Sequence, residues 1–304
     1  MVAPVAGPLT PHASAVTCLE PLALKSGVAD RATVARERAR TARELLANCH
    51  FCAHHCGVNR LAGERGLCHA GAETRCFSAQ LEVGEELELI PTFAVALGAC
   101  DLRCDFCITG ASSWNPAAGA GFDAQAMAIQ AQRALAAGAR TVTLLGGEPT
   151  IHLPAALEFV AEMPATAELV WKTNAYGSAE ARAWLAGMFN IWVVDFKFGN
   201  DGCAQRLAGI PDYVRAAREN LLWACENSRL IVRHLLMPGH VECCWAPVAE
   251  WLAAELPGVK VSLRCGFWPA WHARRHPELS RPPSAEECAQ ARKIARGLSL
   301  QLIR

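Results

Sequence analysis

The chain has 304 residues, of which 52% are apolar and 19% charged, which excludes a disordered or fibrous protein and leaves ample material for a core. Its 29 basic residues balance 29 acidic ones, so no overall field attracts nucleic acid or an anionic membrane. The 15 cysteines are unusual, because their odd number and close spacing suit metal binding in a reducing compartment better than a secreted disulfide scaffold.

The amino-terminal part predicts an arm and a helix ahead of the first cysteines. The first residues lack a signal-peptide pattern, and no apolar run reaches ~18 residues, so we expect a cytoplasmic protein without a membrane partner. Residues 1–28, rich in Pro, Ala and Gly, predict an extended surface arm. Good helix formers fill residues 30–47, with Asp30 as a candidate N-cap. Loose alternation predicts a strand over residues 81–90.

Short apolar runs alternate with Ala-rich helical segments from residue 93 onward. The predicted strands are 93–97, 141–145, 168–172, 191–195, 230–236 and 259–263, and the predicted helices are 124–137, 154–162, 179–188, 211–227, 247–256 and 285–296. This order predicts an α/β fold with a parallel sheet. Six units are too few for a closed barrel, so we expect a partial (β/α)6 barrel, with a doubly wound sheet as the alternative. Residues 1–90 would form a cysteine-rich metal-binding extension, and residues 91–304 the barrel with its C-terminal helix.

Polar residues follow most of the predicted strands. Because chemistry in parallel α/β folds lies at the carboxyl ends of strands, we expect these residues to converge on one face. They are Cys100, Cys104 and Cys107, then Gly146, Gly147, Glu148 and Pro149, then Thr173 and Asn174, then Asp195 and Lys197, and finally Arg233.

The segment GACDLRCDFC carries the first cysteine group, with the spacing C-x3-C-x2-C. Three thiolates in a loop can hold one face of a [4Fe–4S] cluster, which usually takes four cysteines. The remaining iron would then be open to substrate, as in catalytic zinc sites. The alternatives are a structural zinc with a distant fourth ligand, or three buried cysteines.

The cysteine group, with Phe106 before the third cysteine, resembles the signature of the radical SAM superfamily. The Gly146-Gly147-Glu148-Pro149 segment resembles the GGE motif of the same superfamily, and the resemblance spans residues 93–263. It implies an open iron that binds S-adenosylmethionine, whose reductive cleavage yields a 5′-deoxyadenosyl radical. It also implies a reductase partner such as flavodoxin or ferredoxin.

Later motifs resemble the pyruvate formate-lyase activating enzymes. Asp195-Phe196-Lys197 resembles their D-x-K motif, and the segment from Arg233 to Gly239 resembles their R-x-x-x-x-P-G. The resemblance implies that Lys197 and Arg233 lie near the carboxylate or sulfonium of S-adenosylmethionine; an exposed Asp195–Lys197 ion pair is the alternative. Thr173-Asn174 resembles the T-N turn, but Lys172 replaces an Asp that helps bind a monovalent cation in the activases. Whether a cation site is retained stays open.

A second cysteine group has the spacing C-x2-C-x3-C-x11-C. Four cysteines leave no open coordination position, so we expect either an auxiliary [4Fe–4S] cluster or a structural zinc. The segment from Cys56 to Arg60 resembles the C-G-V-N-R of an activase-like subgroup, whereas Ala53-His54-His55 departs from its P-R-x. The ligands would be Cys49, Cys52, Cys56 and Cys68, with His50, His54 and His55 as alternatives.

The leading hypothesis is a radical SAM enzyme that abstracts hydrogen, by resemblance from a protein or peptide such as a glycyl radical enzyme. A small-metabolite enzyme and an iron–sulfur carrier or scaffold are the alternatives. An aromatic and basic patch could recognise substrate or only cap the barrel; it comprises Trp268, Trp271, His272, Arg274, Arg275 and His276. The remaining cysteines are expected to be small buried hydrophobes, with Cys265 also a candidate functional thiol: Cys203, Cys225, Cys243, Cys244, Cys265 and Cys288.

Overall fold

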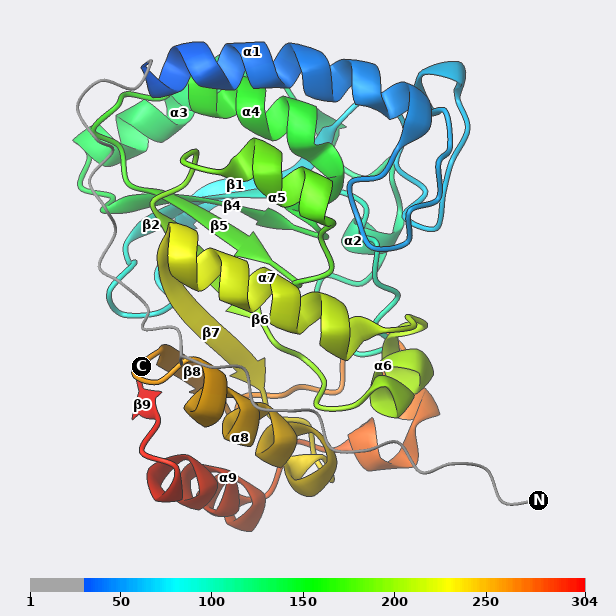
Figure 1. Cartoon of the computed structure of the whole chain (residues 1–304), viewed down its shortest axis with the longest axis vertical. Coiled ribbons are helices and arrows are strands. Elements are labelled where there is room, and N and C mark those ends of the chain that lie inside the picture. The colour runs from blue at the N-terminus through cyan, green and yellow to red at the C-terminus, as the bar shows by residue number, and fades with distance from the viewer. Residues whose placement is uncertain (1–29, 304) are drawn as a thin grey trace.

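A nine-stranded sheet, in the order β3-β1-β2-β4-β5-β6-β7-β8-β9, organises the chain (Figure 1). The computed structural model describes residues 30–303, so the expected arm over residues 1–28 lies outside the described residues. The strands are β1 (Arg75–Glu82), β2 (Thr92–Leu97), β3 (Ala120–Gly121), β4 (Thr141–Gly146), β5 (Leu169–Thr173), β6 (Ile191–Asp195), β7 (Arg229–Leu235), β8 (Lys260–Arg264) and β9 (Gln301–Leu302).

The helices follow the strands in the expected alternation. They are α1 (Arg31–Glu44), α2 (Ala111–Trp114), α3 (Ala124–Ala136), α4 (Leu153–Glu162), α5 (Ala179–Leu185), α6 (Asp201–Ala208), α7 (Tyr213–Asn227), α8 (Ala246–Glu255) and α9 (Ala285–Gly297). Within residues 30–303, no helix is long and apolar enough to cross a membrane.

The sheet is parallel from β2 through β9 and is an open, partial barrel. All six predicted parallel strands are confirmed as β2, β4, β5, β6, β7 and β8, with bounds that differ by one residue at most. One edge is extended by β1, which pairs antiparallel with β2. The N-terminal segment therefore contributes a strand to the barrel's own sheet, and the proposed division at residue 90 stays a prediction.

The structure differs from the sequence-based predictions at three places: residues 81–90, α6 and the start of α1. The strand predicted over residues 81–90 is wrong: β1 ends at Glu82, and residues 83–91 leave the sheet as a loop. The helix α6 was not predicted, although Asn200 caps it by accepting a hydrogen bond from the Cys203 amide at 2.8 Å. Asp30 precedes α1 without a side-chain capping bond.

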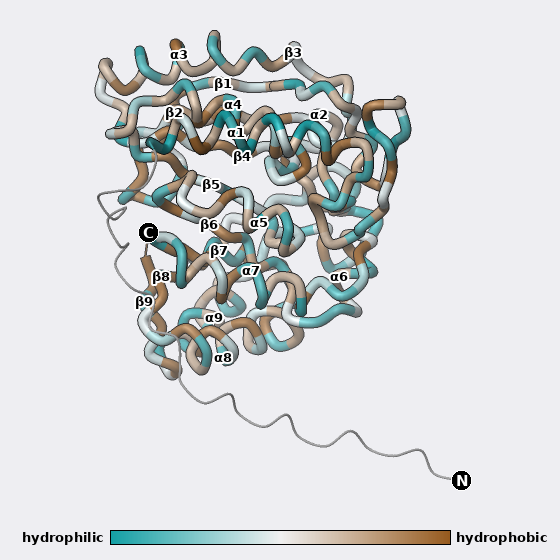
Figure 2. Tube along the Cα trace, turned by 45° about the horizontal axis from the view of Figure 1, so that its top comes forward, coloured by the Kyte–Doolittle hydropathy of each residue, from teal (hydrophilic) through white to brown (hydrophobic). Residues whose placement is uncertain are grey.

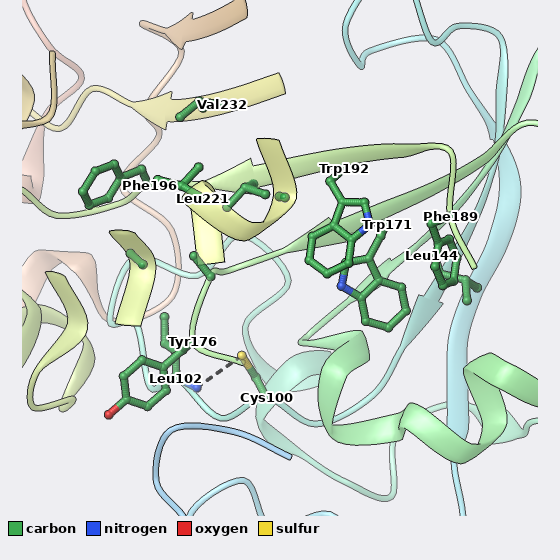
Figure 3. Close-up of a cluster of buried hydrophobic side chains, with 14 of the residues drawn as sticks. Cys100, Leu102, Leu144, Trp171, Tyr176, Phe189, Trp192, Phe196, Leu221 and Val232 are labelled. Carbon is green, nitrogen blue, oxygen red and sulfur yellow. Dashed lines mark hydrogen bonds between the residues drawn. The ribbon is translucent and has the colours of Figure 1, made fainter. Parts of the chain in front are cut away.

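Side chains that alternate between the two faces of the parallel strands form an aromatic core on one face and the barrel interior on the other. Trp171 of β5 and Trp192 of β6 pack together with Phe189 on the first face. The Trp171 ring lies 4.7 Å from that of Phe189 and 6.0 Å from that of Trp192 (Figure 3). Because strand side chains alternate between faces, the residues next to the tryptophans lie on the other face. There the apolar side chains form a separate cluster with a residue of the 83–91 loop: Leu89, Val170, Ile191, Val193 and Ile231.

The hydropathy pattern follows this arrangement. Hydrophobic residues recur along the strands, whereas hydrophobic and hydrophilic residues alternate along the helices (Figure 2). The helix α1 is joined to the barrel by polar bonds as well, since the Arg38 guanidinium donates to the carbonyl oxygens of Trp184 and Ala186 at 2.9 and 2.6 Å. The N-terminal helix is thereby fastened to the outside of the partial barrel.

Candidate functional site

A cavity of about 280 Å³ lies at the carboxyl ends of the strands. It collects nearly all of the residues that the strand-end argument selected, so the expected convergence is observed for them. Pro149 is the exception, since it is buried at the start of a short 3-10 turn (Pro149–His152) and does not line the cavity. The lining includes Cys100, Cys104, Phe106, Cys107, Gly146, Gly147, Glu148, Thr173, Asn174, Asp195, Lys197 and Arg233.

The three cysteines of the first group face this cavity from the loop after β2. Cys100 and Cys104 are buried, and Cys107 is more open. Burial raises the pKa of the Cys104 thiol to about 12 and raises that of Cys100 well above its usual value, so without a cation the thiols stay protonated. Phe106 holds the loop from inside, with its ring 6.1 Å from Phe198 and 6.2 Å from Phe267.

The spacing of the sulfur atoms separates a single ion from a cluster. In a tetrahedral site with Zn–S bonds of ~2.3 Å, the sulfurs lie about 3.8 Å apart. Among the described residues, neither Cys100, Cys104 and Cys107 nor any three of the four N-terminal cysteines come within 4.8 Å of one another. The cavity triad therefore has the donor type of an iron–sulfur site, and its three sulfurs are not gathered around the position of a single ion.

Two glycines let the end of β4 run directly against the cysteine loop. A Cβ atom on Gly147 would lie 1.7 Å from the Ala99 carbonyl oxygen, and one on Gly146 would lie 2.2 Å from that of Leu97. The φ of Gly146 is +145°, a value that L side chains rarely adopt. At this approach the Gly147 amide donates to the Leu97 carbonyl at 2.8 Å. The glycine pair is thus required for the shape of the cysteine loop.

Glu148 joins the ends of β4 and β5 beneath the cavity. Its carboxylate accepts from the Thr173 hydroxyl at 2.8 Å and from the Asn174 amide at 2.8 Å. Burial, with the neighbouring Asp101 carboxyl, raises the pKa of Glu148 to about 7. The Asn174 side chain in turn donates to Asp101 at 2.7 Å, within the cysteine loop. Glu148 and Asn174 therefore position the cysteines as well as lining the cavity.

The loop of residues 83–91 inserts two carboxylates into the interior of the barrel. The guanidinium of Arg233 donates from Nε and Nη2 to both oxygens of Glu86, at 2.8 and 2.7 Å, and also contacts Glu85. Lys172 donates to Glu85 at 2.8 Å. Burial opposes ionisation of Glu85, but Lys172 and Arg233 outweigh it and lower its pKa. Glu86 is 0% exposed and also pairs with Arg264 at 3.3 Å.

Sequence reasoning missed these glutamates because it assigned them to a strand. The available signal was a pair of adjacent acids between Gly84 and Pro91, residues that favour a loop. With the glutamates included, the four basic side chains that line the cavity have carboxylate partners close to them. The basic residues are Lys172, Lys197, Arg233 and Arg264, and the carboxylates are Glu85, Glu86 and Asp195.

The second cysteine group lies against the first. His54 donates from Nε2 to the Asp101 carbonyl at 2.9 Å, and Cys52 forms an isolated β-bridge with Gly177. Cys52 and Cys68 belong to a small buried cluster that includes Ala99, the residue just before Cys100. Cys49 is also buried, whereas Cys56 is exposed. Any metal held by this group would therefore sit beside the cavity loop.

The predicted aromatic and basic patch divides into two parts. Trp268 lines the mouth of the cavity and is 67% exposed, and Ile108 beside it is 79% exposed. Trp271 instead packs edge-on against Trp114 at 5.7 Å, and His276 pairs with Asp105 at 2.7 Å. Of the patch residues, Trp268 is the one that lines the cavity.

Comparison with known proteins agrees with this geometry. The family model "Radical SAM superfamily" matches residues 95–252. An uncharacterized protein of Methanocaldococcus jannaschii is 30% identical over 274 residues, which cover 86% of this chain and 78% of that protein. The solved structure of Streptococcus suis SuiB bound to its precursor peptide SuiA matches with a TM-score of 0.50 and 15% identity, over 67% of this chain.

The chain spans about half of SuiB, since the match covers 46% of that protein. A domain of a pyruvate-formate lyase-activating enzyme from Bacteroides vulgatus matches with a TM-score of 0.41 and 19% identity, over 53% of this chain and 96% of that domain. At 15% identity, the match to SuiB shows a shared fold.

Gly147→Ala should displace the cysteine loop, because the added methyl group would overlap the Ala99 carbonyl. We expect anaerobically reconstituted protein to lose about four irons per chain, the content of one cubane cluster. Gly121→Ala is the matched control, since a Cβ there meets nothing within 4 Å. Equal iron content in the two variants would show that glycine at position 147 is not required for the cysteine loop to hold the cluster.

Arg233→Ala should lower the free energy of unfolding by roughly 3–5 kcal/mol, because it leaves Glu86 buried without its main partner. Urea-induced unfolding under anaerobic conditions measures this change. Arg229→Ala removes an exposed ion pair with Glu168 and should cost only about 0–1 kcal/mol. A similar small loss in both variants would show that the buried pair is not needed.

Proposed function

The chain belongs to the radical SAM superfamily and is an enzyme of that superfamily, and on this premise we propose which of its residues carry the chemistry. Membership brings a [4Fe–4S] cluster and S-adenosylmethionine. We assign the cluster to Cys100, Cys104 and Cys107. The observation that carries this assignment is their convergence, from one loop, on a cavity that the other strand-end motifs also line.

The residues around the triad fit the expected cofactor. When bound, the cluster supplies the electron that cleaves S-adenosylmethionine to a 5′-deoxyadenosyl radical. Gly146 and Gly147 keep side chains out of the space beside the cysteines. Basic side chains line the cavity and favour the cofactor's carboxylate, and Lys197 and Arg233 are its nearest candidates in the resemblance to the activases. Asp195 keeps Lys197 in place through a 2.5 Å ion pair.

Lys172 supplies a positive charge where the activases have an acidic ligand for a monovalent cation. Its ammonium group donates to both oxygens of Glu85, at 2.8 and 2.9 Å. A bound monovalent cation beside Asp195 is then unnecessary for charge balance. We propose that this ammonium group replaces the cation.

The cavity mouth supports a protein or peptide as the substrate. Ile108 and Trp268 place large exposed apolar surfaces at the rim, where they would be covered by a partner that reaches a residue into the cavity. The structural neighbour SuiB was solved with its precursor peptide. A glycine of a glycyl radical enzyme remains one candidate target, as the activase resemblance implies.

The N-terminal cysteines support a second iron–sulfur centre more than a structural zinc. No three of the sulfurs of Cys49, Cys52, Cys56 and Cys68 lie within 4.8 Å of one another, so they are not gathered around one tetrahedral ion. Their position beside Ala99 suits a role in bringing electrons from flavodoxin or ferredoxin to the cavity. Since four cysteines leave no open position, this centre would not bind S-adenosylmethionine.

Cys104→Ala and Cys52→Ala form a matched pair that tests both assignments. Each variant should lose about four of eight irons, because each removes one cluster ligand. With dithionite and S-adenosylmethionine, only Cys104→Ala should stop 5′-deoxyadenosine formation. Undiminished formation by Cys104→Ala would overturn the catalytic assignment, and loss of zinc in place of iron from Cys52→Ala would overturn the second cluster.

The substrate class can be tested with ultrafiltered cell extract. A protein or peptide substrate predicts that the retained fraction stimulates 5′-deoxyadenosine formation by the reconstituted enzyme, and that protease treatment abolishes the stimulation. Cys104→Ala with the same fraction is the control. Stimulation by the filtrate that survives protease would point instead to a small metabolite.

A further inference from the structure

A third group of metal-ligating side chains lies outside the cavity. The ligand atoms of Cys203, His240 and Cys243 all fall within 4.8 Å of one another. Cys203 is in the first turn of α6, and the other two residues follow β7 in the turn that leads to α8 (Figure 1). None of the three lines the cavity. The expectation that these cysteines are only buried hydrophobes is wrong for Cys243, which is exposed.

The distances within this group suit a single tetrahedral ion. The sulfurs of Cys203 and Cys243 are 3.9 Å apart, close to the ~3.8 Å that two Zn–S bonds of 2.3 Å require. Within residues 30–303, these three residues have ligand atoms that all lie within 4.8 Å of one another. The cavity cysteines and the N-terminal cysteines do not form such a group. The group of Cys203, His240 and Cys243 therefore differs from the other two cysteine groups in having ligand atoms close enough for one ion.

His240 is oriented as a ligand by its second nitrogen. Its Nδ1 donates to the Pro238 carbonyl at 2.9 Å, which leaves the lone pair of Nε2 directed away from the backbone. Arg206 approaches that nitrogen at 3.3 Å and also pairs with Glu278. Because the Arg206 side chain is 46% exposed, it can turn toward Glu278 and free Nε2.

The backbone around the group is held before any ion binds. Asn200 donates to the Cys243 carbonyl at 2.7 Å and to the Cys203 sulfur at 3.3 Å, so it links α6 to the turn after β7. Gly199 allows this contact, since a Cβ there would lie 2.4 Å from the Cys244 carbonyl. Cys243 lies in a π-helical turn (Val241–Trp245), a rare conformation that is frequent at functional sites, and His240 directly precedes this turn.

We propose that Cys203, His240 and Cys243 bind one Zn²⁺, with the fourth position open to water on the exposed side of Cys243. Two thiolates and an imidazole are ligands that zinc prefers. Binding releases the two thiol protons, so the divalent ion and two thiolates leave the site neutral. The ion joins the segment after Asp195 and Lys197 to the segment after Arg233, and it stabilises the strand ends that supply those side chains.

The test compares zinc in anaerobically reconstituted wild-type protein and in Cys203→Ser/Cys243→Ser. We expect about one zinc fewer per chain in the variant, with equal iron. This difference is independent of the N-terminal cysteines, which are intact in both proteins. Cys265→Ser/Cys288→Ser is the matched control and should keep its zinc.

A second measurement covers failure of the double variant to fold. His240→Gln should also lose the zinc, and a chelator should lower the melting temperature of the wild-type protein but not of His240→Gln. Equal zinc in wild type and folded variants, or a Cys203–Cys243 disulfide in the anaerobic protein, would overturn the proposal.

Discussion

The ion pair between Glu86 and Arg233 is the interaction on which the cavity depends. A carboxylate removed from water in this way is tolerated only with a well-aligned partner, and the two-point contact with the guanidinium provides one. The pair holds the 83–91 loop inside the barrel, next to Arg233, which lines the cavity. Lys172, which also lines the cavity, pairs with Glu85 in the same loop. The loop therefore fixes two of the basic side chains that the cavity presents.

On the other side of the cavity-lining residues, close backbone contact sets the position of the cysteine loop. The Gly146–Gly147 pair brings β4 against residues 97–99, and Glu148 with Asn174 connects the same loop to β5. The motif residues that are candidates for contacting the cofactor therefore also hold the cysteine loop in position. Their substitution would change the geometry of the triad before it changed any contact with a cofactor.

The spacing of the sulfur atoms distinguishes the cysteine groups that suit iron–sulfur clusters from the one that suits a single metal ion. The sulfurs of the cavity triad and of the N-terminal tetrad are not gathered within 4.8 Å, whereas the 3.9 Å separation of Cys203 and Cys243 suits one ion. The triad and the tetrad adjoin through Ala99 and Asp101, which suits electron transfer between them. The third group lies in α6 and in the turn between β7 and α8, outside the cavity lining. An ion there would stabilise the fold and would not contact a substrate in the cavity.

The sequence by itself determined the alternation of strands and helices and the convergence of their polar ends, because local periodicity and the parallel order decide both. It also determined the cysteine motifs, whose close spacing needs no long-range contact. Only the tertiary structure decided where Glu85 and Glu86 lie, since their partners Lys172 and Arg233 are distant in the chain. The same holds for Cys203 and Cys243, which come together because β6 and β7 are neighbours in the sheet and bring the segments after them side by side.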